Sequence, residues 1–362
     1  MTHPLRYYVA PLMLVLLLLP TQALAGIVVG SFNVLHLGWS NGKNYEKLAH
    51  VAKHFDLLAL QEVMTEEGLE RLVNEMEAAS GERWGVMASH AIGRGSYREM
   101  YAFVWRERAV EYAGGAVVYI DARDQFAREP FLAKFRSRHT GQEIAMANIH
   151  VLYGNSVGDR LPEIQAMADI WDWMAEVYPG VPRKIVGDFN LAPQHRAWGA
   201  LRERGAVPAI QTGATTLSPR QGRYANLYDN IWKEAGAFQI SERGILRFPD
   251  LLGITHERAR DVVSDHAPVY VALGGARLEL VPFQARQFDT RVVAANDPAY
   301  DCIDLNRSDY QDLTRLPHIG DARARDIQAG RPWQSAQELR RINGIGPARV
   351  ADIIGSGLLC QG

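Results

Sequence analysis

Polar side chains that could bind a metal or move a proton stand beside six apolar runs between residues 33 and 266. They are Asn33 after IVVGSF, Gln61 and Glu62 after LLAL, His150 after IAMANI, Asp188 and Asn190 after KIVG, Asp229 and Asn230 before IW, and Asp265 and His266 before APVYVAL. The start of one strand lies beside the end of an antiparallel neighbour, so all six places could meet at one rim. Each motif alone is typical of a turn, whereas their joint occurrence predicts a single site.

These residue types favour metal-assisted hydrolysis of a phosphoester. Glu62, together with Asp265 or Asn33, offers the oxygen ligands that Mg²⁺ prefers. In such a reaction the cation neutralises the charge that grows on the phosphate, an imidazole or carboxylate activates water, and a second imidazole protonates the departing oxygen. The sequence has no His or Cys cluster that suits zinc and no glycine-rich phosphate loop before a helix, which argues against a zinc enzyme and a P-loop hydrolase.

The elements that must position these residues form a first domain, which we place at 26–273. Short apolar runs alternate there with amphipathic segments, which is typical of an α/β or α+β sandwich. Apolar side chains at helical spacing predict a helix from Asp159 to Tyr178. The pattern ends at Gly274-Gly275, and residues 274–301 have no sustained period, which indicates a linker or an extended pass over the first domain.

Residues 302–362 have a different character. They contain two similar units, LPHIGDARARDI and INGIGPARVADI, whose glycines Gly320 and Gly346 are 26 positions apart. The length of 362 residues also favours two domains. The formal net charge of −2 predicts no general attraction to nucleic acid, although a local basic groove remains compatible with it.

Residues 1–25 have the pattern of a signal peptide. An apolar run from Tyr8 to Leu19 is shorter than the ~20 residues that span a bilayer, and Ala23-Leu24-Ala25 suits signal peptidase. We therefore expect a periplasmic or secreted protein with no stable membrane insertion after cleavage; the alternative is an uncleaved anchor. In an oxidising compartment Cys302 and Cys360 are expected to form a disulfide, the alternative being two free thiols.

Taken in order, the motifs SFNV, LALQEV, NIH, GDFN, YDNI and SDHAPV resemble the endonuclease/exonuclease/phosphatase superfamily, and within it the deoxyribonuclease I branch. The resemblance spans about 31 to 270. It implies an α/β, four-layered sandwich of two packed mixed β-sheets with helices outside, and Mg²⁺ or Mn²⁺ as cofactor. It also implies the site roles: His150 and His266 as the imidazole pair, Asp229 orienting His266, Asp188 and Asn190 holding phosphate and water, and Glu62 as the principal metal ligand.

The stretch SYREMYAFVW is similar to the same branch. The similarity implies that Tyr97 contacts a deoxyribose, Arg98 approaches a phosphate and Glu99 orients His150. In AREPFLAKF, at 127–135, Lys134 stands where a phosphate-contacting arginine is expected. Met64 stands where the branch has an arginine that enters the minor groove, so the resemblance leaves open whether single- or double-stranded DNA is preferred.

The two C-terminal units resemble tandem helix-hairpin-helix motifs, as in the DNA-receptor proteins of bacterial competence, over about 302–359. The resemblance implies a small all-α domain in which Gly320, Gly344 and Gly346 leave backbone N–H groups open to a phosphate. His318 stands where the first hairpin would have a glycine. The alternative is a packing module without a ligand.

The sequence therefore predicts an exported, divalent-metal-dependent DNA endonuclease with a tethered DNA-binding module. Two alternatives remain at this point. The same site could act on a phospholipid or an inositol phosphate, or the chain could be a DNA-uptake receptor without activity. The sequence identifies no protein partner.

Overall fold

The computed structural model describes residues 26–39, 41–219, 222–285, 302–308, 310–356 and 358–360. The predicted signal peptide, 1–25, and most of the predicted linker, 286–301, lie outside these residues. Every helix within the described ranges is too short or too polar to cross a membrane.

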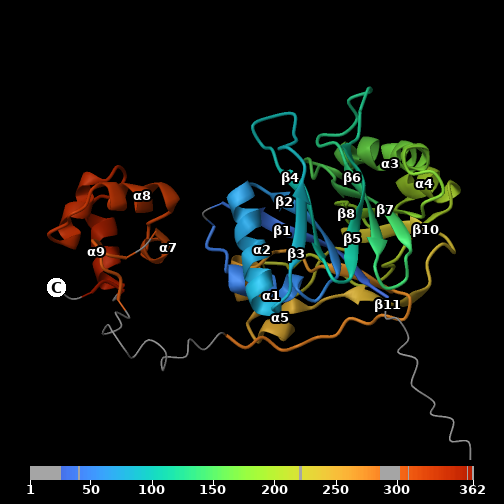
Figure 1. Ribbon diagram of the computed structural model, residues 1–362. Helices are drawn as coiled ribbons and strands as arrows, with labels where there is room; N and C mark the ends of the chain where they lie inside the picture. Colours follow the sequence, from blue (N-terminus) through green and yellow to red (C-terminus); the bar gives the residue numbers. More distant parts are fainter. Residues whose placement is uncertain are drawn as a thin grey trace, which may run out of the picture.

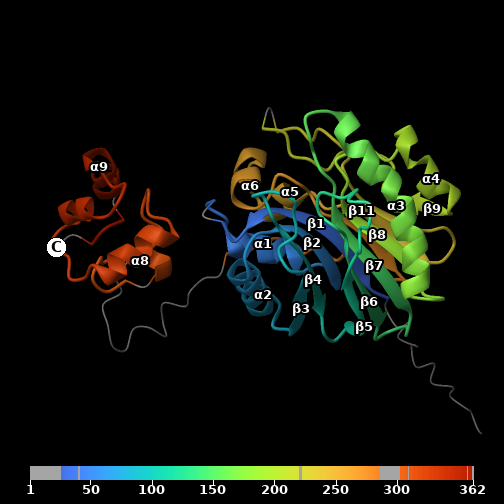
Figure 2. The same ribbon diagram turned by 90° about the horizontal axis from the view of Figure 1, so that it is seen from above.

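Two mixed β-sheets, each of six strands, lie face to face in the first domain (Figures 1 and 2). The first sheet has the order β11 (Ile240–Ile245), β12 (Val269–Leu273), β1 (Val28–Leu37), β2 (Leu57–Val63), β4 (Met100–Arg106), β3 (Trp84–Ala88). The second has the order β5 (Val110–Val118), β6 (Phe131–Ser137), β7 (Glu143–His150), β8 (Arg183–Asp188), β10 (Asp229–Glu234), β9 (Ala206–Pro208). Only β1 with β2 and β7 with β8 pair in parallel among these strands. Each sheet thus has a parallel pair at its centre.

Helices cover the outer face of each sheet (Figure 2). Those on the first sheet are α1 (Tyr45–Ala52), α2 (Glu66–Ser80), α5 (Phe248–Leu252) and α6 (His256–Val262). Those on the second are α3 (Val157–Val177), the 3₁₀ turn η1 (Arg196–Trp198) and α4 (Gly199–Glu203). The structure therefore confirms the predicted four-layered sandwich, and α3 confirms the helix expected from Asp159 to Tyr178.

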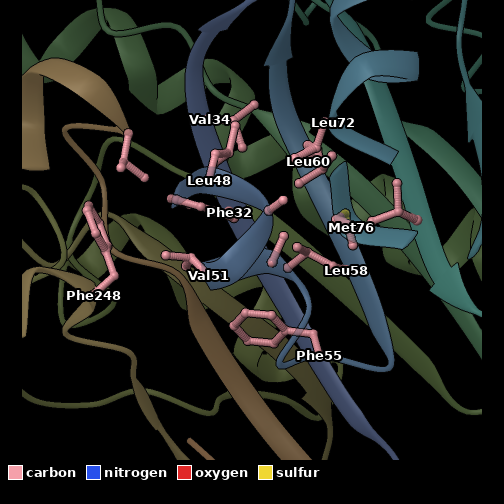
Figure 3. Packing of buried hydrophobic residues seen from close by; sticks show 14 of the residues in the cluster. Phe32, Val34, Leu48, Val51, Phe55, Leu58, Leu60, Leu72, Met76 and Phe248 are labelled. Atoms are coloured by element: carbon pink, nitrogen blue, oxygen red, sulfur yellow. The ribbon is translucent and has the colours of Figure 1, made fainter. Parts of the chain in front are cut away.

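Three apolar clusters hold the four layers together. One lies between the sheets, and the other two lie between each sheet and its helices. Figure 3 shows the cluster on the first sheet, where Phe32 and Leu58 of the strands meet Leu48 and Val51 of α1. β2 is buried along its full length because both of its faces are covered, which explains its continuous apolar run.

The ends of α2 and α3 follow local capping rules. The Thr65 hydroxyl accepts a hydrogen bond from Gly68 N at 3.0 Å at the start of α2, and Gly81 ends that helix in the left-handed region. Asp159 Oδ2 accepts from Ser156 N at 2.9 Å and closes the capping box of α3. Such caps satisfy helix N–H groups that lack intrahelical partners.

The chain after β12 continues over the first domain as far as residue 285. Val281 N donates to His54 Nε2 at 3.1 Å, and Val281 O lies 2.7 Å from His50 Nε2. The Phe283 ring packs edge-on against His50, with 5.1 Å between the ring centroids. The extended pass expected within 274–301 is therefore seen for its described part, and packing of the first domain extends beyond Leu273.

The C-terminal residues form a separate small helical domain. Its elements are α7 (Tyr310–Leu313), α8 (Asp321–Ala329), the 3₁₀ helix η2 (Ala336–Arg341) and α9 (Pro347–Gly355). They pack around their own apolar cluster, which includes Ile327, Trp333 and Ile353. The predicted disulfide between Cys302 and Cys360 is present, and the chain ends that carry it are paired through Ile303 and Leu359.

Candidate active site

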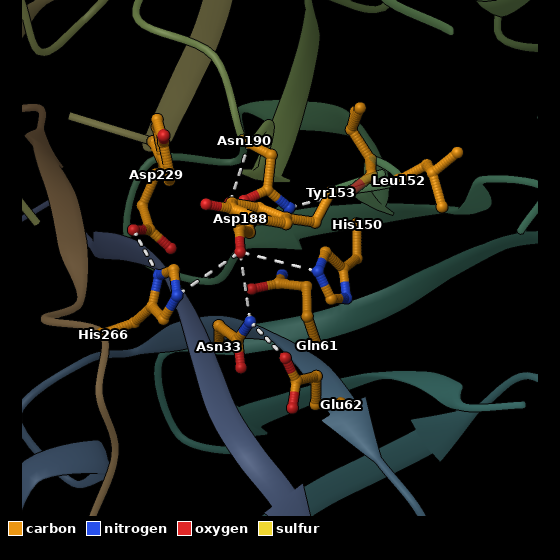
Figure 4. A network of polar contacts seen from close by, with 12 residues as sticks. Asn33, Gln61, Glu62, His150, Leu152, Tyr153, Asp188, Asn190, Asp229 and His266 are labelled. Atoms are coloured by element: carbon orange, nitrogen blue, oxygen red, sulfur yellow. Dashed lines mark hydrogen bonds and ion pairs between the residues drawn. The ribbon is translucent and has the colours of Figure 1, made fainter. Parts of the chain in front are cut away.

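The predicted catalytic residues meet at the rim where β1, β2, β7 and β8 end and β10 begins (Figure 4). Their centre is Asp188, whose Oδ2 lies 3.6 Å from His150 Nε2 and 3.6 Å from His266 Nε2. Asp229 is the register partner of Asp188 in the antiparallel pair β8–β10, while His150 is its partner in the parallel pair β7–β8. Strand pairing therefore places His150, Asp188 and Asp229 at the same level of the second sheet. His266 comes from the segment that precedes β12 of the first sheet.

Each imidazole is oriented by its own carboxylate. His150 Nδ1 lies 3.0 Å from Glu99 Oε1, and His266 Nδ1 lies 2.8 Å from Asp229 Oδ2. Glu99 and Asp229 are fully buried, whereas each imidazole keeps a small exposed edge. A carboxylate on Nδ1 fixes which ring nitrogen faces the reaction, so both Nε2 atoms are available to substrate.

The carboxylates also set the charge of the two imidazoles. Burial alone would lower the pKa of each histidine. The charge and hydrogen bond of Glu99, together with the charge of Asp188, nevertheless raise the pKa of His150, and Asp229 with Asp188 raises the pKa of His266 well above its usual value. Burial raises the pKa of Asp188, a shift that the two imidazoles oppose.

A Glu99→Gln variant should move the His150 limb of the pH profile of kcat/KM to lower pH. The Glu99 carboxylate holds the His150 pKa above its usual value, so its loss destabilises the imidazolium, and burial and the nearby Arg128 cation then lower this pKa against the remaining charge of Asp188. The midpoint moves down whether the limb rises or falls with pH. Glu107→Gln, on a surface turn at the other end of β4, is the control, and an unmoved midpoint in Glu99→Gln would show that the pair does not tune the reaction.

Glu62 is presented to the rim by distortions in two strands. β1 is irregular between Asn33 and Leu37, where Leu35 and His36 adopt left-handed backbone, and Glu62 itself has φ 59°. The Glu62 carboxylate accepts from Asn33 Nδ2 at 2.9 Å and from His36 N at 3.1 Å. Bulges re-aim side chains in this way, and left-handed backbone at a non-glycine residue is typical of functional sites.

Asn33 turns its amide nitrogen, rather than its oxygen, toward the carboxylates. Its Nδ2 also donates to Asp188 Oδ2 at 3.2 Å, while its Oδ1 accepts from Leu35 N at 3.0 Å. In this orientation Asn33 links Glu62 to Asp188. Its predicted role as an oxygen ligand would require the side-chain amide to rotate, so that Oδ1 rather than Nδ2 faces the carboxylates.

The carboxylates of the rim fit a hard divalent cation. Asp229 Oδ1 and Asp265 Oδ1 are buried and have no hydrogen-bond partner among the described residues. Asp188, Asp229 and His266 each offer a ligand atom, all within 4.8 Å of one another. Glu62 and Asp265 both line a cleft of about 470 Å³ that also contains His150 and His266. Oxygen-rich groups with unused acceptors are what Mg²⁺ or Mn²⁺ requires.

Asn190 is held in the left-handed region two residues after β8 ends at Asp188. Its N donates to Asp188 Oδ1 at 3.0 Å and its Nδ2 donates to Val151 O at 2.9 Å. The side-chain oxygen therefore faces away from the carbonyl that anchors the amide. This geometry keeps Asn190 in the cleft beside Asp188, where the sequence places it.

The motif that contains Tyr97, Arg98 and Glu99 lies at the site, whereas Lys134 does not. Tyr97 is partly exposed and donates from its hydroxyl to Glu99 Oε2 at 3.0 Å, and Arg98 is exposed beside it. Lys134 pairs with Ala145, five residues before His150 along β7, and its Nζ lies 3.2 Å from Glu143. Five strand residues extend about 17 Å, so the phosphate contact expected of Lys134 does not fit its position.

Arg128 is the cation that sequence reasoning missed. It is buried, its Nε lies 3.6 Å from Glu99 Oε1, and its guanidinium donates to His150 O at 2.9 Å. It belongs to the same AREPFLAKF stretch as Lys134, six residues earlier. The sequence did hold a signal for this residue: Arg128 stands two residues before Pro130, outside the predicted strands, whereas Lys134 lies within β6.

Buried amides join the two sheets beneath the rim. Gln61 of β2 donates to Asn148 Oδ1 at 2.6 Å, and Asn148 of β7 donates to Leu60 O and Ala102 O. Asn230, which sequence analysis grouped with the site, instead bonds both polar groups of the Ile210 backbone. Gln61 and Asn230 therefore support the site without facing it.

The helical domain carries two hairpins of the same geometry. His318 and Gly344 occupy equivalent positions with φ 64° and 76°, and Gly320 and Gly346 are the N-caps of α8 and α9. Gly320 and Gly346 have extended backbone, so positive φ is required at Gly344 and His318 rather than at the repeated glycines. A Cβ at Gly346 would meet nothing within 4 Å, which leaves open space before α9.

Comparison with known proteins agrees with both domains. A deoxyribonuclease of Thioalkalivibrio sp. (strain K90mix) is 47% identical over 369 residues, covering 99% of this chain and 99% of that protein. Deoxyribonuclease-1 of Homo sapiens is 25% identical over 271 residues, covering 70% of this chain and 94% of the human protein. The family described as helix-hairpin-helix motif matches residues 299–356.

Solved structures share the fold of the first domain. A mannosyl-6-phosphatase from Bacteroides thetaiotaomicron has a TM-score of 0.51 at 17% identity, covering 68% of this chain and 99% of that chain. An endonuclease/exonuclease/phosphatase family protein from the same organism has a TM-score of 0.50 at 17% identity, covering 68% of this chain and 97% of that chain. With a relative 47% identical along nearly its whole length, the chain belongs to the deoxyribonuclease I-like family of the endonuclease/exonuclease/phosphatase superfamily and carries a C-terminal helix-hairpin-helix domain.

Proposed function

We propose that this protein is an exported, divalent-metal-dependent endonuclease that hydrolyses phosphodiester bonds of DNA. The observation that carries the proposal is the pair of carboxylate-oriented imidazoles whose Nε2 atoms both lie 3.6 Å from one oxygen of Asp188. Two imidazoles that face one point can serve as acid and base on a single phosphate. The deoxyribonuclease relative and the helix-hairpin-helix match support DNA as the substrate, in preference to a phospholipid or an inositol phosphate.

The residues of this chain divide the reaction among themselves. One of His150 and His266 removes the proton of the attacking water, and the other returns a proton to the departing sugar oxygen. Glu99 and Asp229 keep the rings aligned, and Asn190 positions the phosphate beside Asp188. Arg128, which contacts both Glu99 and the His150 backbone, holds the first pair in place.

A divalent cation, Mg²⁺ or Mn²⁺, would be held by Glu62 with Asp265 and, after an amide turn, Asn33. When bound, it supplies charge neutralisation for the phosphate oxygens. Lys43 joins the two backbone segments that carry Asn33 and Asp265, because its Nζ donates to Val34 O and to Val263 O at 2.7 Å each. Burial lowers the Lys43 pKa to about 8, although Glu62 and Asp265 oppose that shift.

A Glu62→Gln variant should need a higher Mg²⁺ concentration for half-maximal DNA cleavage. The substitution keeps the size of the side chain but removes the charge that attracts a hard cation. Glu66→Gln, exposed in the first turn of α2, is the matched control. A Mg²⁺ titration of Glu62→Gln that overlays that of the wild type would reject Glu62 as a ligand.

Export is proposed from the pattern of residues 1–25 and supported by the Cys302–Cys360 disulfide. Disulfides persist in oxidising compartments, so a periplasmic or secreted location suits this bond. After removal of 1–25, we propose that the mature enzyme acts without membrane insertion.

A further inference from the structure

An exposed tryptophan stands beside the metal side of the rim. Of the eight tryptophans, all of which the structure describes, Trp39 alone is exposed, at 46%. Its ring stacks on His36, with centroids 4.4 Å apart and 22° between planes, and meets Tyr97 edge-on at 6.2 Å. His36 Nε2 in turn lies 3.2 Å from Glu62 Oε2. Trp39 is therefore linked to the catalytic rim through a single intervening ring.

The loop that carries Trp39 is fixed against the start of α2. Gly38 has φ 99°, and a Cβ there would lie 2.2 Å from Thr65 Oγ1, so the backbone approaches too closely for any other residue. Asn41 Nδ2 donates to Leu35 O at 3.1 Å and to His36 O at 3.2 Å. These contacts hold the partly exposed Trp39 ring in one place beside His36 and Tyr97, so little ordering of this loop would be needed for a ligand to stack on it.

A second exposed ring stands on the opposite, His150 side of the cleft. Tyr153 is 58% exposed and lines the cleft with His150 and Asn190 (Figure 4). The guanidinium of buried Arg160 lies 4.3 Å from the Tyr153 ring centroid and donates to Tyr153 O at 2.8 Å. Arg160 also donates to Asn190 O, so one buried cation holds both the ring and the backbone of the site. Tyr153 thus has one face supported and the other free.

We propose that Trp39 and Tyr153 stack nucleobases on the two sides of the scissile phosphate, and that the preferred substrate is an unpaired DNA strand. This inference rests on the proposed function and names its substrate class. Aromatic faces bind single-stranded nucleic acid without sequence preference because every base has a π-face. In a duplex those faces are already covered by neighbouring base pairs, so stacking on the protein would first require unstacking.

The side chains around the cleft agree with an unpaired strand. The partly exposed Met64 lies two residues after Glu62, where it offers an apolar side chain rather than a cation to a groove. Tyr228 also lines the cleft, with its ring 5.6 Å from the Arg160 guanidinium. Rings on either side of a catalytic centre suit a strand whose bases are splayed from the backbone.

The test compares kcat/KM of the full-length enzyme on one DNA strand and on the same strand in a duplex, with Mg²⁺. We expect the wild type to prefer the single strand. Trp39→Ala and Tyr153→Ala should each lower kcat/KM on the single strand by about 5- to 100-fold, the effect of losing one base stack, with a much smaller effect on the duplex. Trp39→Phe and Tyr153→Phe should restore most of the loss, whereas Trp39→Leu, which is apolar but lacks a π-face, should not.

Removing the base instead of the ring gives a second readout. A single strand with one abasic residue next to the cleavage position should be cut more slowly by the wild type, and Trp39→Ala or Tyr153→Ala should add little further loss, because the same stack is then already absent. Binding of a fluorescently labelled strand, measured by fluorescence anisotropy in the presence of chelator, should rank the affinities of the variants in the same order.

The outcomes separate this inference from the proposed function. Equal losses on single strand and duplex, full activity of both alanine variants, or a wild-type preference for duplex would overturn the stacking role. If the wild type cuts neither substrate with Mg²⁺, the proposed function fails, and the metal-free binding series still decides on stacking: equal affinity of wild type and alanine variants for the single strand would reject it.

Discussion

Replacing His150 or His266 with alanine is expected to lower kcat on DNA by about 10²- to 10⁴-fold while leaving the protein folded. Each ring points Nε2 toward Asp188 Oδ2 and is oriented by its own buried carboxylate. Each alanine substitution therefore removes one proton-transfer group. Because both act on the same phosphate, the double variant should lose much less than the product of the two single losses.

Steady-state kinetics on plasmid DNA, with circular dichroism to check folding, would measure this effect. His90→Ala is the control, since His90 is exposed and follows the outer strand β3. If His150→Ala and His266→Ala are both folded and both keep wild-type turnover, the two imidazoles are not the acid and base.

Removal of the helix-hairpin-helix domain is expected to raise KM for long DNA by about 10²- to 10⁴-fold with little change in kcat. Two binding sites on one polymer raise the effective concentration of the second site without any new contact at the first. The shortened chain should comprise residues 26–285 rather than end at Leu273, because Val281 and Phe283 pack against the histidines of α1 and of the turn that follows it.

A pair of glycine variants separates DNA binding by the hairpin from folding. Gly346→Val should weaken DNA binding and keep the fold, because Gly346 has φ −89° and its Cβ would point into open space before α9. Gly344→Val should instead destabilise the domain, since Gly344 has φ 76° and its Cβ would lie 2.6 Å from the Arg323 guanidinium. Equal KM values for full-length, 26–285 and Gly346→Val proteins would mean that the hairpins only pack.

The positions of most catalytic residues could be predicted because each stands at one end of an apolar run, and the ends of neighbouring strands meet at one edge of a sheet. His150, Asp188 and Asp229 occupy paired register positions of adjacent strands, as the prediction of a common rim requires. Lys134 was misplaced because the resemblance aligned a cation along β6, where the strand carries it away from the rim. Arg128 was missed because a buried arginine in a loop depends on tertiary contacts with Glu99 and His150.

Backbone conformation was harder to predict than side-chain position. The left-handed Leu35, His36 and Glu62 accompany irregular pairing of β1 and of β2, and neither leucine nor glutamate favours positive φ by itself. His318 likewise adopts φ 64°, at the position where the helix-hairpin-helix resemblance has a glycine. Its ring lies 2.7 Å from Asp352 Oδ2, a contact between residues 34 positions apart that the repeat pattern does not reveal.

We propose that this rim of strand ends hydrolyses DNA phosphodiesters with a divalent cation. The most direct test is incubation of the purified mature chain with plasmid DNA, RNA and sphingomyelin, each with Mg²⁺ and with chelator, beside His266→Ala. We predict cleavage of DNA that requires Mg²⁺ and is lost in His266→Ala. Cleavage of sphingomyelin alone, or DNA cleavage that survives both the chelator and His266→Ala, would show that this rim is not a metal-dependent DNA-hydrolysing site.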